Sequence, residues 1–133
     1  MNIVIMGCGR VGARIAAELE AEGHAVSVID SDADAFHLLP RDFRGRQVTG
    51  NGVDQRVQSE AGIEEADVFM ALANGDNRNA MAAQVAKHQH QVKRVVARIF
   101  DPERAEVYSE LGVEAVNPTV VVSQLVRDAA FGA

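Results

Sequence analysis

The sequence contains one cysteine, one tyrosine and no tryptophan among its 133 residues. A single cysteine excludes an internal disulfide and the cysteine clusters of structural zinc sites, and it suits a reducing compartment. The four histidines form no ligand cluster either. His88 and His90 are two positions apart on an expected helix and face different directions, and the other two are isolated. We therefore expect no metal site.

Positive charge and long apolar runs are also lacking. Lysine and arginine number 13 against 19 acidic residues, for a formal net charge of -6. This balance argues against nucleic acid and anionic lipid as partners. No apolar run approaches the ~20 residues that cross a bilayer, and no basic segment precedes the first one. We expect a soluble cytoplasmic protein without a signal peptide or membrane insertion.

What the chain does contain is a regular alternation of short apolar runs and helical patterns. Hydrophobic residues make up 47% of the sequence, enough for a substantial core. Strands are predicted over 2–6, 25–29, 46–49, 67–73, 94–99 and 113–116. Helices are predicted over 10–21, 32–39, 53–61, 76–90, 102–111 and 118–130.

This alternation predicts an α/β fold in one domain, residues 1–133. The predicted strands do not alternate in polarity, which is typical of a parallel sheet covered on both faces. Right-handed crossovers then give a Rossmann-type, doubly wound, six-stranded sheet in the order 3-2-1-4-5-6. The last helix is unusually apolar, with Val120, Leu125 and Phe131 among its residues. It either packs on the sheet or contacts a second subunit or a partner domain.

A glycine-rich turn follows the first strand and opens the first helix. It reads Gly7-Cys8-Gly9-Arg10-Val11-Gly12, the G-x-G-x-x-G spacing of dinucleotide-binding folds. Gly7 permits the tight turn, Gly9 lets a pyrophosphate approach the backbone, and Gly12 lets the helix pack on the strand. The helix N-terminus offers free N–H groups to phosphates. Asp30, at the end of the second strand, is predicted to accept hydrogen bonds from ribose hydroxyls and to disfavour NADP(H).

Two arginines and the cysteine carry further hypotheses. Arg10 either reaches a phosphate or stays solvated on the first helical turn. Arg98, at the end of the fifth strand, points at the phosphates, across a dimer interface, or into solvent. Cys8 is interpreted as a spacer in the turn, with a reactive thiol as the alternative.

Loops after the third and fourth strands supply the remaining candidates. In an open α/β sheet, ligands bind beyond the carboxyl ends of the strands, so Ala73 and Asn74 should lie beside the ribose and pyrophosphate. Asn51, in the loop after the third strand, either closes over the adenine or forms an ordinary turn. Asp76 is interpreted as the N-cap of its own helix.

Catalytic groups are less evident than binding groups. The one tyrosine, Tyr108, lies on a predicted helix without a Tyr-x-x-x-Lys pattern. The sequence therefore predicts cofactor binding without a complete enzyme.

The sequence resembles the N-terminal regulatory domain of Trk-type potassium uptake proteins, the RCK, KTN or TrkA-N domain, over nearly the whole chain. The resemblance is carried by residues 3–30, the loop Thr49-Gly50-Asn51-Gly52 with its helix to Gly62, residues 66–74, Asp76-x-x-Asn79, Val95-Val96-Ala97-Arg98, and residues 111–113 ahead of Asn117-Pro118. The glycine turn alone fits many families. The helix-opening Asp76-x-x-Asn79 and the Ala97-Arg98 strand end are more specific.

The resemblance implies a regulatory role rather than catalysis. Such domains are cytosolic, bind NAD(H) or ATP/ADP, assemble as homodimers and larger rings, and gate a potassium transporter of the membrane, on whose inner face they lie. By resemblance, Gly7 to Val11, Asp30, Ala73, Asn74 and Arg98 would contact the nucleotide. Arg10 is similar to the arginine of members that hold ATP phosphates, and a C-terminal RCK lobe is absent from this chain.

Two other functions remain open. The chain could be the cofactor-binding lobe of an NAD-dependent dehydrogenase whose catalytic lobe is missing. It could also be a nucleotide-binding regulator of another transporter or exchanger.

Overall fold

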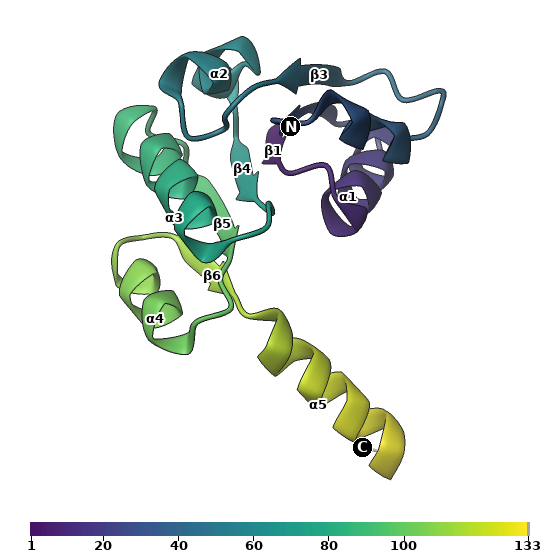
Figure 1. The fold of residues 1–133 in the computed structure, drawn as a ribbon, viewed down its shortest axis with the longest axis vertical. Helices are drawn as coiled ribbons and strands as arrows, with labels where there is room; N and C mark the ends of the chain where they lie inside the picture. The colour runs from purple at the N-terminus through teal and green to yellow at the C-terminus, as the bar shows by residue number, and fades with distance from the viewer. Residues whose placement is uncertain (133) are drawn as a thin grey trace.

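A six-stranded, all-parallel sheet forms the centre of the computed structural model, which describes residues 1–132. Its order is β3-β2-β1-β4-β5-β6, so the predicted doubly wound topology is confirmed (Figure 1). The strands are β1 (Asn2–Met6), β2 (Ala25–Asp30), β3 (Arg46–Thr49), β4 (Val68–Ala71), β5 (Arg94–Arg98) and β6 (Glu114–Val116). Because all strands are parallel, their carboxyl ends meet at one edge, where loops from both halves of the sheet come together.

Helices connect every pair of consecutive strands. They are α1 (Arg10–Ala21), α2 (Gln55–Glu60), α3 (Asp76–Gln84) and α4 (Pro102–Glu110), with short 3-10 segments η1 (Ala33–Leu38) and η2 (Ile63–Glu65). A last helix, α5 (Pro118–Phe131), follows β6. The helix predicted over 76–90 changes to a π-helical turn, η3 (Val85–Gln89), and the one predicted over 32–39 is a 3-10 helix. Apolar spacing predicts where a helix lies but does not distinguish these hydrogen-bonding patterns.

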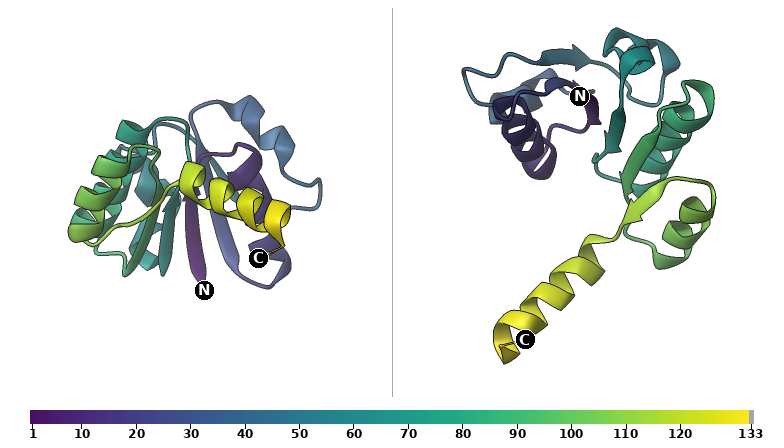
Figure 2. Two further views of the ribbon diagram at one scale, coloured as in Figure 1. Left: turned by 90° about the horizontal axis from the view of Figure 1, so that it is seen from below. Right: turned by 180° about the vertical axis from the view of Figure 1, so that it is seen from behind.

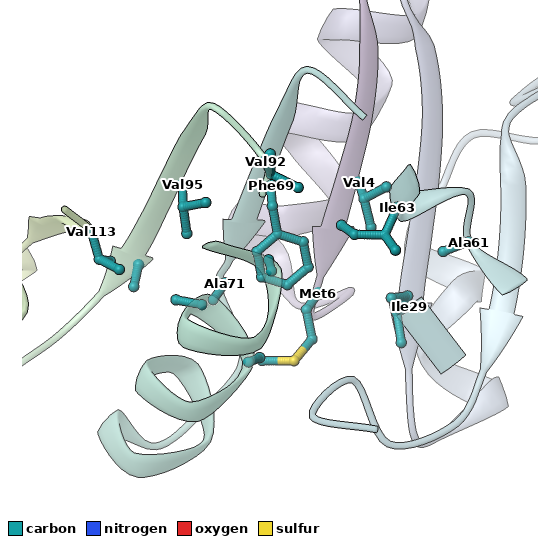
Figure 3. Close-up of a cluster of buried hydrophobic side chains, with 14 of the residues drawn as sticks. Val4, Met6, Ile29, Ala61, Ile63, Phe69, Ala71, Val92, Val95 and Val113 are labelled. Carbon is teal, nitrogen blue, oxygen red and sulfur yellow. The ribbon is translucent and has the colours of Figure 1, made fainter. Parts of the chain in front are cut away.

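The core lies on both faces of the sheet, as the non-alternating strands predict. On one face, Phe69 of β4 is fully buried and packs among Met6 of β1, Ile63 of η2 and Val95 of β5 (Figure 3). On the other face, α1 and η1 cover β1 and β2 around the fully buried Ile5. Between these two layers, the carboxyl ends of β2, β1 and β4 lie side by side in the sheet.

Helix α5 does not pack on its own sheet, so the first of the two predictions for it is wrong. It extends away from the domain in Figure 1 and in the right-hand view of Figure 2, and none of its described residues is buried. Leu125 is 62% exposed and Phe131 is 80% exposed. Asn117 is the one residue between β6 and α5, so the chain has no loop in which to turn back over the sheet.

At 14 residues, α5 is the longest helix in the described part of the chain. Among residues 1–132, no helix is long and apolar enough to span a membrane.

Candidate functional site

Steric demands at two positions shape the glycine turn between β1 and α1. Gly7 has a φ of +106°, and a Cβ there would lie 2.6 Å from the backbone nitrogen of Ala73. A Cβ on Gly12 would lie 1.8 Å from the carbonyl oxygen of Gly7, so α1 can approach the turn only with glycine at this position. A Cβ on Gly9 would meet nothing within 4 Å. The space in front of Gly9 is therefore open to a ligand.

Asp30 joins the end of β2 to this turn. Its Oδ2 accepts a hydrogen bond from the backbone N–H of Cys8 at 2.8 Å, and its Oδ1 accepts one from Asp32 at 2.9 Å. Each carboxylate oxygen keeps a further lone pair for a ligand hydroxyl. The carboxylate thus orders the turn and also faces the space beside it.

Cys8 is fully buried within the turn. Burial, and then the negative charge of Asp30, raise the pKa of its thiol to about 11. The thiol therefore stays protonated at neutral pH, which favours the spacer interpretation over a reactive cysteine.

The loops after β4 and β5 are held together by Asn79 of α3. This side chain is 1% exposed. Its Oδ1 accepts from the N–H of Ala73 at 2.9 Å, and its Nδ2 donates to the carbonyls of Ala73 at 2.8 Å and Arg98 at 2.9 Å. All of these partners are backbone groups, so Asn79 positions the two strand ends whatever side chains they carry.

Asp76, one turn earlier, makes the matching contact to the loop after β5. Its carboxylate accepts from the N–H groups of Phe100 and Asp101, each at 2.8 Å. The prediction that Asp76 caps its own helix is wrong, because Gly75 is the N-cap residue and makes no side-chain cap hydrogen bond. The carboxylate of Asp76 instead satisfies two backbone N–H groups of the loop after β5.

Arg98 lies partly buried at the end of β5 and points toward β4. Its Nη2 donates to the carbonyls of Leu72 at 2.9 Å and Ala73 at 3.0 Å, and its guanidinium lies 5.8 Å from the centre of the Phe100 ring. Of the three predictions for Arg98, a solvated strand end is therefore wrong. The Nη2 group of Arg98 is therefore already hydrogen-bonded to the backbone that follows β4.

These groups surround a cavity of about 840 Å³ at the carboxyl edge of the sheet, which we call the carboxyl-end cavity. Its volume falls in the range of small-molecule sites. Of the eleven predicted site residues, ten line it: Gly7, Cys8, Gly9, Arg10, Val11, Asp30, Asn51, Ala73, Asn74 and Arg98. The eleventh, Gly12, packs beneath the turn.

Some lining residues were not predicted from the sequence. Arg78 on α3, Asp32 after β2, and Leu38 of η1 all border the carboxyl-end cavity. The carboxylates of Asp30 and Asp32, which follow β2, and the guanidinium groups of Arg10, Arg78 and Arg98, from α1, α3 and β5, all border this cavity. Asn51 uses its Oδ1 to accept from Val53 in a local turn, at 3.1 Å, and also borders the cavity. Among residues 1–132 there is no cluster of three metal-binding side chains.

Comparison with known proteins gives one family match. Residues 3–118 match the model of the TrkA-N domain. The chain is 55% identical over 116 residues to the Trk system potassium uptake protein TrkA of Streptomyces coelicolor, covering 87% of this chain and 52% of that protein. The chain therefore spans about half the length of the curated relatives it matches.

Solved structures share the fold at lower identity. The TrkA-N domain of the inner membrane protein ybaL from Escherichia coli has a TM-score of 0.86 at 19% identity, covering 96% of this chain and 95% of that one. The Kef CTD of Shewanella denitrificans in its AMP-bound form has a TM-score of 0.83 at 22% identity, over 99% of this chain and 80% of that one. The GsuK channel bound to NAD has a TM-score of 0.72 at 21% identity, over 86% and 21%.

Proposed function

The chain belongs to the TrkA-N domain family, and we propose that it is a regulatory module which binds an adenine nucleotide and controls a potassium transporter of the membrane. One observation carries the proposal: the carboxyl-end cavity is lined by an open glycine turn, by the carboxylate of Asp30 at the end of β2, and by guanidinium groups. The Streptomyces coelicolor relative is named as a potassium uptake protein, which supports the transporter as the partner.

The ligand is an adenine nucleotide, NAD(H) or ATP/ADP. The ribose would bind Asp30, and the phosphates would lie on the turn from Gly7 to Val11 beside Ala73, Asn74 and Arg98, where the first turn of α1 presents free N–H groups. A 2′-phosphate would meet the carboxylates of Asp30 and Asp32, which disfavours NADP(H). The AMP-bound Kef domain and the NAD-bound GsuK channel share this fold, which supports the ligand class.

The nucleotide would control the transporter by binding more tightly to one of two arrangements of neighbouring subunits. A shift of the population from 1:99 to 99:1 requires a difference in binding free energy of ~5.5 kcal/mol, shared over the sites of the assembly. The module itself would then be a sensor rather than an enzyme, placed on the cytoplasmic face through its partner.

The assembly is a homodimer or a larger ring that uses α5. Apolar side chains cover this helix, including Val121, Leu125 and Val126, all at least 46% exposed. On the α1 side of the sheet, Met70 of β4 and Val96 of β5 are only half-buried, because α1 covers β1 and β2 instead. Burying two such surfaces against each other would stabilise a dimer. Sedimentation of the wild type and of Leu125→Asp would test this, with loss of the dimer expected for the variant.

Titration calorimetry tests the nucleotide proposal directly. The purified protein is titrated with NADH, NAD⁺, NADPH, ATP, ADP and AMP in one buffer. Binding of NADH or of ATP and ADP, with NADPH much weaker, is the expected result. If none of the six binds at millimolar concentration, the proposal fails. Oxidation of NADH by added carbonyl substrates would favour the dehydrogenase alternative instead.

A further inference from the structure

Two polar side chains are buried among residues 1–132, and they are Gln58 of α2 and Asn79 of α3. Asn79 hydrogen-bonds to the backbone of the loops after β4 and β5. Gln58 is fully buried and does not border the carboxyl-end cavity. A polar side chain that reaches neither solvent nor the cavity requires a different explanation.

The amide of Gln58 joins the loop after β3 to α3. Its Nε2 donates to the carbonyl oxygen of Gly52 at 2.8 Å and to that of Ala82 at 3.2 Å. Gly52 is itself buried, and within residues 1–132 the amide of Gln58 is the one hydrogen-bond donor to its carbonyl oxygen. Because a buried carbonyl without a donor is costly, this hydrogen bond restricts where the backbone of the loop can lie.

Close packing restricts the same loop from another side. A Cβ on Gly52 would lie 2.3 Å from the Sδ of Met6, so the backbone of the loop packs directly against the end of β1. Asn51, the preceding residue, is exposed and borders the carboxyl-end cavity. The packing at Gly52 and the hydrogen bond from Gln58 therefore set the position from which Asn51 faces the cavity.

The second polar atom of the Gln58 amide has no hydrogen-bond partner. Its Oε1 is buried and unpaired among residues 1–132. An unpaired buried acceptor lowers stability, and an apolar side chain of similar size would avoid that loss. The presence of an amide at this position is therefore better explained by the loop that its Nε2 holds than by the packing of the core.

The loop after β3 lies where the base of a bound nucleotide would be. It begins beside Asp30, because the N–H of Gly50 donates to the backbone carbonyl of Asp30 at 3.0 Å. In the sheet, β2 separates β3 from β1 and its glycine turn. A nucleotide with its ribose at Asp30 and its phosphates on the glycine turn would therefore direct its base toward the loop after β3.

We propose that Gln58 is a positioning residue, whose amide fixes the loop after β3 so that this loop can bind the base of the nucleotide. Gln58 acts through the loop and does not touch the ligand. Without its donor, the buried carbonyl of Gly52 would turn toward water, and the loop would sample other positions. The inference rests on the proposed nucleotide-binding function and adds to it a residue outside the cavity that controls affinity.

The test compares Gln58→Met with the wild type in two measurements. Calorimetric titration should show AMP binding about fivefold weaker in the variant, because part of the binding free energy is then used to order the loop. Hydrogen–deuterium exchange of the free protein should be faster at residues 50–54 and unchanged in β1 and α1. The urea midpoint should move little, since the variant removes the unpaired Oε1 and leaves an unpaired carbonyl at Gly52.

Gln55→Met is the matched control. It makes the same substitution in the same helix, at an exposed residue that does not border the cavity. Its AMP affinity and its exchange at residues 50–54 should stay within about twofold of the wild type. Gln58→Leu also removes the amide, and it replaces Gln58→Met in both measurements if the methionine variant does not fold.

Three results would overturn the inference while nucleotide binding stands. The first is a folded Gln58 variant with the AMP affinity or the loop exchange of the wild type. The second is faster exchange throughout the sheet, and the third is failure of both Gln58 variants to fold, since Gln58 would then support the core as a whole. If the wild type binds no nucleotide, the proposed function itself fails and the inference fails with it.

Discussion

Replacing Asp30 by alanine tests how one carboxylate serves both the fold and the ligand. In the free protein, Asp30 accepts hydrogen bonds from the N–H groups of Cys8 and Asp32 at 2.8 and 2.9 Å. Cys8 is fully buried, so its N–H would have no water to replace the lost acceptor. Two lost hydrogen bonds to a charged acceptor, one of them buried, should lower the free energy of unfolding by ~2 kcal/mol.

Asp30→Ala should also affect the binding of NADH and of NADPH differently. Loss of the ribose contacts should cost ~2 kcal/mol of NADH binding, about a 30-fold rise in Kd. NADPH binding should not weaken, because the repulsion of its 2′-phosphate by Asp30 is lost as well. The ratio of NADPH to NADH Kd values should therefore fall toward one.

The assay combines urea unfolding with calorimetric titration of both cofactors. Asp42→Ala is the control, because it removes the same charge from an exposed position outside the cavity. Asp30→Asn separates the two effects, since it removes the repulsion and keeps one acceptor oxygen. A folded Asp30→Ala protein with an unchanged NADPH to NADH ratio would refute the assigned role of this carboxylate.

Three further predictions concern the turn and its supports. Asn79→Ala should lower the free energy of unfolding by ~3 kcal/mol in urea denaturation, because three hydrogen bonds of a buried amide are lost; a loss below 1 kcal/mol would contradict this. Gly12→Ala should prevent stable folding, since its Cβ would lie 1.8 Å from the carbonyl of Gly7, whereas Gly9→Ala has open space and should fold normally, as circular dichroism would show. Cys8, with its pKa raised to about 11, has ~0.1% thiolate at pH 8, so Ellman's reagent should label it fast only after unfolding.

The sheet order and the glycine turn could be predicted because each depends on short-range patterns. Apolar strands without alternation indicate a parallel sheet, and the handedness of crossovers then leaves few topologies. Gly7 and Gly12 occupy backbone positions that other residues cannot adopt without a clash, and their spacing identifies the turn. Asp30 could be located because the connection from β1 through α1 to the end of β2 has a conventional length in this fold.

Contacts that side chains make with loops from other strands could not be predicted in the same way. Asp76 is at a position where a helix cap is an ordinary reading, yet its carboxylate goes to N–H groups 24 and 25 residues away. Arg78 reads as one more charged residue on a helix surface. The partners of Asp76 and the position of Arg78 depend on which loops lie close together at the carboxyl edge of the sheet. The spacing of residues in the sequence does not give the distances between those loops.

The loop after β5 connects the carboxyl-end cavity to the start of α5. The N–H of Phe100 donates to Asp76 at 2.8 Å, and the carbonyl of Phe100 accepts from the Nδ2 of Asn117 at 3.1 Å. Asn117 is the N-cap of α5, with its Oδ1 accepting from the N–H of Thr119 at 3.0 Å. The first turn of α3, which bears Arg78, and the first turn of the exposed apolar helix are therefore anchored on the same residue. The backbone of Phe100 therefore joins the proposed ligand site to the proposed assembly surface.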